Sequence, residues 1–181
     1  MSCFKKILVV GFEFDEERTL LWLKERLREV FHIDVELAGD LPLVALYDAG
    51  RGQYLASSFF EELVGLRKAG QIVLGVTKED IYEPGLNFVF GVASPMYAVA
   101  IISTKRLHNS FYGLAENEDL YLRRVATEAV HEIGHTLGLG HCPDPHCVMH
   151  FSNTLADTDI KGYHFCPNCW RKASRRLCLG D

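Results

Sequence analysis

The sequence predicts an α+β (mixed α/β) fold in which a twisted mixed sheet packs against helices. Short apolar runs alternate with amphipathic helical stretches before residue 80, two further β-rich runs follow, and a long helix then leads into a cysteine-rich C-terminal segment. Such alternation is typical of strands and helices packed in layers. The chain has 181 residues, 48% of them hydrophobic, which is enough for one domain with a sizeable core.

The N-terminal half is predicted to contain three strands and two helices. Ser58 and Glu61 have the spacing of a capping box, which would open the second helix, and Gly70 is placed to close it. In order, the predicted elements are a strand over residues 6–10, a helix over 15–31, a strand over 32–37, the helix that starts near Ser58, and a strand over 71–76.

A hairpin and a long helix are predicted next. Residues 87–93 and 97–103 are β-rich runs separated by Ser94-Pro95, which indicates two strands joined by a turn. Asn117 then precedes two acidic residues, a pattern that favours the start of a helix. This helix carries the residues with the clearest chemistry in the chain.

The stretch HEIGHTLGLGH runs from His131 to His141. On an α-helix, His131 and His135 lie one turn apart on the same face. A straight helix would place His141 roughly 15 Å beyond His131, too far for both rings to bind one ion. We therefore expect the chain to turn back at Gly138, because glycine accepts the left-handed conformation that ends a helix.

This pattern predicts a catalytic zinc site with His131, His135 and His141 as ligands. Three imidazoles leave the fourth tetrahedral position open for water, whose pKa zinc lowers to about 7. Glu132 is the candidate general base, which would take a proton from this water and pass it to a departing amine. The alternative is a helix whose surface histidines match by chance, but the glycine and third histidine at fixed offsets disfavour it.

Two closely spaced cysteine pairs overlap this motif. Four thiolates in such pairs suit a closed, structural zinc site, formed here by Cys142, Cys147, Cys166 and Cys169. Two disulfides are the competing interpretation, and they require an oxidising compartment. The N-terminus shows no signal peptide, because only a short apolar run precedes the acidic residues near Glu13. A reduced cytosol therefore favours zinc, and Cys3 and Cys178 are expected to remain unpaired thiols.

Over residues 131–169 the chain resembles the archaemetzincins, a branch of the metzincin zinc peptidases. The resemblance rests on the histidine motif that runs directly into Cys142, followed by Cys147, Met149 and the pair Cys166 and Cys169. It implies two zinc ions per chain and the following roles: His131, His135 and His141 as ligands of a catalytic zinc, Glu132 as general base, Met149 as the Met-turn, and Cys142, Cys147, Cys166 and Cys169 around a structural zinc. Phe151 stands where some metzincins have a zinc-binding tyrosine, so no tyrosine ligand is predicted.

The resemblance implies a zinc-dependent metallopeptidase made of one catalytic domain over residues 1–181. Residues 1–138 would form an N-terminal subdomain with the active-site helix, and residues 139–181 a small C-terminal subdomain with the Met-turn and the cysteines. In metzincins an edge strand binds the substrate backbone, and residues 87–93 are the candidate, with a plain sheet edge as the alternative. A zinc-stabilised binding or regulatory domain with little turnover is the alternative function, although the intact Glu132 favours an enzyme.

The resemblance implies a peptide substrate, and the composition argues against nucleic-acid and membrane partners. A formal net charge of −5 argues against nucleic acid, and no apolar run is long enough to span a bilayer. A basic C-terminal stretch suits the end of a helix better than a nucleic-acid site, and it contains Arg171, Lys172, Arg175 and Arg176. We expect a cytoplasmic monomer, with no inhibitory pro-segment before the first strand.

Overall fold

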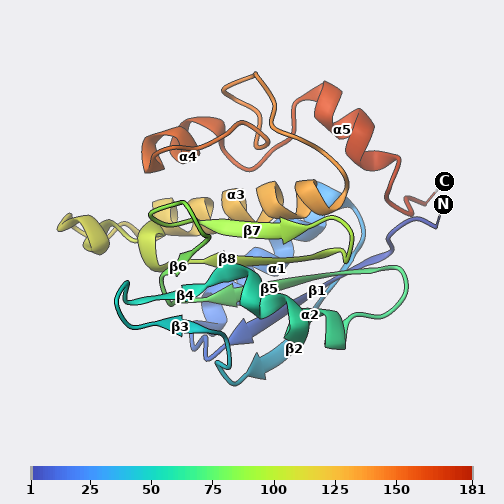
Figure 1. Ribbon diagram of the computed structural model, residues 1–181. Coiled ribbons are helices and arrows are strands. Elements are labelled where there is room, and N and C mark those ends of the chain that lie inside the picture. The colour runs from blue at the N-terminus through green and yellow to red at the C-terminus, as the bar shows by residue number, and fades with distance from the viewer. Residues whose placement is uncertain (1, 181) are drawn as a thin grey trace.

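The computed structural model describes residues 2–180 and contains a five-stranded mixed sheet with helices on both faces (Figure 1). Four strands run parallel, and the edge strand β7 runs antiparallel to its neighbour β8. The strand order is β2-β1-β5-β8-β7, with bounds Lys6–Phe12 (β1), Asp34–Leu41 (β2), Gln71–Thr77 (β5), Gly91–Ser94 (β7) and Val99–Ser103 (β8). The mixed α/β class predicted from the sequence is confirmed.

Helices cover the sheet on both sides because alternate strand residues point to opposite faces. Val9 of β1 packs in the core shared with α1 and α3, whereas the next residue, Val10, packs with Leu63 of α2. The central strands are buried on both faces and are therefore almost continuously apolar. The three helices span Glu17–Phe31 (α1), Phe60–Leu66 (α2) and Glu118–Thr136 (α3).

A small second sheet was not predicted, because its strands have only two or three residues. It consists of β3 (Tyr47–Asp48), β4 (Gln53–Leu55) and β6 (Ile81–Tyr82). The 3-10 helix η1 (Ala56–Phe59) then leads into α2.

The predicted capping box is wrong. The Ser58 hydroxyl donates to the Leu55 carbonyl at 2.6 Å and accepts from the Leu46 N–H at 2.9 Å, so it is not available to cap α2. The helix ends at Leu66 rather than at Gly70. Gly70 instead takes a φ of 76° in the turn before β5.

The predicted hairpin is confirmed as β7 and β8, but β7 begins only at Gly91. The segment before it is a loop, in which the Asn87 carbonyl accepts from the Gln53 side chain at 2.9 Å instead of joining the strand ladder. Two short helices, η2 (Lys105–Leu107) and η3 (Asn109–Tyr112), precede α3. Asn117 caps α3 as predicted, accepting from the Leu120 N–H at 3.1 Å.

The C-terminal part of the chain lies on the other side of α3 from the sheet (Figure 1). It contains α4 (Leu155–Lys161) and α5 (Pro167–Ser174). The chain then returns to the N-terminus, where a bridge joins Phe4 to Leu177 and a disulfide joins Cys3 to Cys178. The expectation that these two thiols stay unpaired is therefore wrong. No helix among residues 2–180 is long and apolar enough to cross a membrane.

Candidate active site

Three histidines converge at the C-terminal end of α3. His131 and His135 project from the helix, and the chain reverses at Gly138, whose φ is 89°, so that His141 returns to the same place. The ring centroids of His131 and His135 are 4.7 Å apart, and those of His135 and His141 are 5.1 Å apart. One nitrogen of each ring lies within 4.8 Å of the corresponding nitrogens of the other two. This spacing allows three imidazoles to hold one metal ion.

Backbone carbonyls orient two of these rings. His131 Nδ1 donates to the Val148 carbonyl at 2.7 Å, and His135 Nδ1 donates to the Leu139 carbonyl at 2.8 Å. Because a carbonyl only accepts, each Nδ1 carries the proton and each Nε2 keeps a free lone pair. Burial lowers the pKa of His131 well below its usual value and also lowers the pKa of His135 and His141. The rings are thus held in the neutral form that binds metal.

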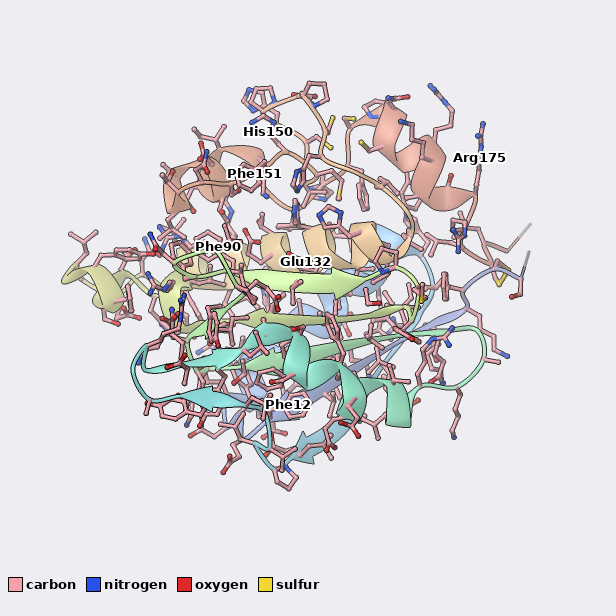
Figure 2. The ribbon with its side chains drawn as sticks, viewed as in Figure 1. Phe12, Phe90, Glu132, His150, Phe151 and Arg175 are labelled. Carbon is pink, nitrogen blue, oxygen red and sulfur yellow. A yellow bond between two sulfur atoms is a disulfide. The ribbon has the colours of Figure 1, made fainter. Side chains whose placement is uncertain are left out.

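Glu132 is buried between α3 and the edge strand β7 (Figure 2). A Cβ added to Gly91 would lie 2.8 Å from the Glu132 Cγ, so the strand passes over this side chain only because Gly91 lacks one. Burial, and then the nearby Glu128, raises the pKa of Glu132 to about 8, while Lys161 lowers it. A carboxyl group that titrates near neutral pH is suited to proton transfer.

Met149 is fully buried beneath the histidines. A Cβ added to Gly134, which lies between the two helical histidines, would overlap the Met149 sulfur. The same Cβ would lie 3.3 Å from the Phe165 ring. The glycine therefore lets the methionine pack directly against the helix turn that carries His131 and His135.

Replacing Gly134 by Ala is expected to lower the free energy of unfolding by about 1–3 kcal/mol, because the new methyl group forces Met149 or α3 to move. Zinc affinity should fall as well. Gly65→Ala is the matched control, since a Cβ at Gly65 in α2 meets nothing within 4 Å. Denaturant unfolding and zinc titration of both variants check this. A Gly134→Ala protein as stable as Gly65→Ala would show that the sulfur contact is unimportant.

A cleft of about 510 Å³ opens over these residues. Phe151, which is 51% exposed, lies at its rim with its ring 5.1 Å from that of His141 (Figure 2). One wall is β7 with the loop before it, and the opposite wall is the segment that follows Met149. The floor is the face of α3 formed by Glu128, His131, Glu132 and His135.

Four thiols gather between α5 and the segment after His141. They are free in the structure, their sulfur atoms all lie within 4.8 Å of one another, and they belong to Cys142, Cys147, Cys166 and Cys169. The Cys142 and Cys166 sulfurs are 3.9 Å apart, too far for a disulfide. Burial raises the pKa of Cys147 and Cys169, whereas at Cys166 the N–H of Cys169 and the neighbouring thiols outweigh burial and lower it. This compact set suits one tetrahedral metal rather than the alternative pair of disulfides.

Sequence reasoning missed Lys161, the last residue of α4. Its side chain is buried, and Nζ donates to the His150 carbonyl at 2.9 Å and lies 3.3 Å from His131 Nδ1. Burial lowers the pKa of Lys161, while Glu128 and Glu132 raise it. No motif marks this lysine, and only the packing of α4 on α3 brings it to the site. Gly91 and Gly134, which make room for Glu132 and Met149, were also missed. Here the sequence did hold a signal, because a glycine inside a predicted strand or helix often marks a close approach of another group.

Comparison with known proteins adds to this geometry. The model of Peptidase family M54 matches residues 42–175. An archaemetzincin of Pyrococcus furiosus is 48% identical over 155 residues, covering 83% of this chain and 81% of that protein. An archaemetzincin of Methanocaldococcus jannaschii is 42% identical over 161 residues, covering 88% of each.

Solved structures of archaemetzincins are also similar. The Methanopyrus kandleri structure has a TM-score of 0.82 at 38% identity, covering 96% of this chain and 95% of that one. The Archaeoglobus fulgidus structure, complexed with malonate, has a TM-score of 0.78 at 37% identity, covering 92% of this chain and 99% of that one. The chain therefore belongs to the archaemetzincins of peptidase family M54 and is a zinc-dependent metallopeptidase.

Proposed function

We propose that His131, His135 and His141 hold the catalytic zinc and that Glu132 is the general base. The observation that carries this proposal is the convergence of three neutral imidazoles beside a buried carboxyl group in one cleft. A zinc ion bound there would acidify a water molecule and polarise the substrate carbonyl. Glu132 would accept a proton from the attacking water and return it to the departing amine. The surrounding burial excludes bulk water from the carboxyl group.

We infer that the protein is a metzincin, with Met149 as its Met-turn, and that it holds two zinc ions. The second ion would lie among the four thiols, where the absence of an open position makes it structural. Because Cys142 directly follows His141, this ion would also fix the third catalytic ligand. Metal analysis of the purified protein tests the count of two.

The edge strand β7 is proposed to bind the substrate backbone by strand addition. Its inner edge pairs with β8, its outer edge borders the cleft, and Gly91 brings it against Glu132. A peptide-like inhibitor is therefore expected to shift the amide signals of residues 91–94 in a heteronuclear NMR spectrum. Residues of β2, at the opposite edge of the sheet, serve as the control. Unchanged β7 signals with the inhibitor bound would remove the strand from substrate binding.

We further propose that residues 1–181 form one catalytic domain, with the active-site helix in residues 1–138 and the Met-turn and cysteines in residues 139–181. The expected form is a cytoplasmic monomer that binds neither nucleic acid nor membrane. The net charge of −5 argues against binding to nucleic acid. The four free thiols favour a reducing compartment such as the cytoplasm. The Cys3–Cys178 disulfide is compatible with it, since intracellular proteins of some organisms carry disulfides.

Digestion of a peptide library with and without a zinc chelator tests the proposed function. We expect cleavage that the chelator stops and that added zinc restores. Cleavage that continues after zinc is removed would contradict the assigned chemistry. Zinc-dependent binding of peptides without any cleavage would instead favour a binding or regulatory domain.

A further inference from the structure

A buried ammonium group lies at one end of the cleft. Lys161 is only 4% exposed, yet it lines the same cleft as Glu132 and β7. Its Nζ donates to the His150 carbonyl. It cannot donate to His131 Nδ1, because that nitrogen carries the proton given to Val148. Since an ammonium has three N–H donors, Lys161 retains donors for a group that enters the cleft.

In the described part of the chain, no neighbouring carboxylate forms an ion pair with the Lys161 ammonium group. Within residues 2–180, no carboxylate oxygen lies within 4.0 Å of the Lys161 Nζ. Glu128, on the facing side of α3, accepts from the Thr158 hydroxyl at 2.9 Å, and Asp159 pairs with Arg124. A buried ammonium is normally paired with an anion, so Lys161 is expected to take such a partner from a ligand in the cleft.

The direction of β7 places Lys161 relative to a bound peptide. Figure 1 shows β7 and α3 running the same way, and Gly91 contacts Glu132 at the start of the strand. A substrate that adds antiparallel to β7 therefore runs toward the part of α3 that precedes His131. There α4 packs on α3 through Thr158 and Asp159, next to Lys161. The portion of the peptide that follows the scissile bond thus approaches the ammonium.

We propose that Lys161 binds a carboxylate just after the scissile bond, which makes this peptidase prefer acidic groups on the leaving side. The inference rests on the proposed function and specifies its substrate class. The carboxylate has two possible sources, an Asp or Glu side chain or the C-terminal end of a short peptide. Either would form a charge-assisted hydrogen bond in a site shielded from water.

Three matched peptides distinguish these sources. Two are amidated and carry Glu or Gln after the scissile bond, and the third carries Gln with a free terminal carboxylate. With the wild-type protein, at least one carboxylate peptide should have a kcat/KM about 10- to 100-fold above that of the amidated Gln peptide. Lys161→Met should bring this ratio close to one with the zinc content unchanged. Lys105→Met, at an exposed position, should leave it unchanged.

Binding of small acids provides a readout that needs no turnover. Glutarate and glutaramate each offer one carboxylate to the metal, and only glutarate offers a second. Calorimetry with the zinc-loaded wild-type protein should show about tenfold tighter binding of glutarate, and Lys161→Met should abolish the difference. Equal binding of the two acids, or equal cleavage of all three peptides, would overturn the role of Lys161. If no peptide is cleaved, the proposed function fails, while the two acids still decide whether Lys161 binds carboxylates.

Discussion

Replacing Glu132 by Gln is expected to lower kcat by about 10²- to 10⁴-fold while zinc remains bound. Glutamine has the same size and fits the space under Gly91, but it can neither accept the proton of the attacking water nor return it to the amine. Because Glu132 carries no metal ligand role in the proposal, the three histidines should keep their geometry. Steady-state kinetics on a cleaved peptide, together with metal analysis, measure both effects.

Glu61→Gln is the control for this experiment, since Glu61 is an exposed residue of α2 on the other face of the sheet. It should leave both kcat and zinc content unchanged. Unaltered turnover in Glu132→Gln would remove this residue from the mechanism. Loss of zinc in Glu132→Gln would instead mean that the carboxyl group is needed to assemble the site. The loss of turnover would then be explained by the missing metal and would no longer support Glu132 as the base.

Local sequence signals predicted the parts of the fold that depend on neighbouring residues. The spacing of His131 and His135, the cap at Asn117 and the reversal at Gly138 all follow from helix geometry, and each is seen in the structure. The hairpin of β7 and β8 follows from two β-rich runs and the turn between them. Hydrophobic runs likewise predicted β1, β2 and β5, with ends displaced by a few residues.

Tertiary contacts decided what the sequence could not predict. Ser58 matches a capping box, yet the nearby Leu46 and Leu55 backbone groups take its hydroxyl. Cys3 and Cys178 are 175 residues apart, and only the docking of the C-terminal segment on Phe4 brings them together. Lys161 reaches the active site through the packing of α4, which leaves no periodic pattern in the sequence. Such contacts join distant segments, so no local rule predicts them.

The four-cysteine site has the largest expected effect on stability. Structural zinc sites stabilise small folded regions by several kcal/mol, because the unfolded chain holds no preformed site. Here the cysteines join the segment after His141 to α5, and the Cys142 N–H also donates to the Met149 carbonyl at 2.9 Å. Removing one cysteine of this proposed zinc site should therefore loosen the whole segment that carries His141 and Met149, and it should also release the proposed second metal ion.

Cys166→Ser is expected to reduce bound zinc from two ions to one and to lower the melting temperature markedly. Cys166 accepts from the Cys169 N–H at the start of α5, and serine can replace that cap but is a poor zinc ligand. The affinity for the remaining zinc should also fall, because His141 is no longer held by its neighbour Cys142. Cys3→Ser is the control, since it opens the terminal disulfide but leaves the four thiols intact and should retain both ions. Metal analysis and thermal unfolding of both variants separate the two effects. Two tightly bound zinc ions in Cys166→Ser would contradict a metal among these cysteines, and the convergence of the four sulfurs would then need a different explanation.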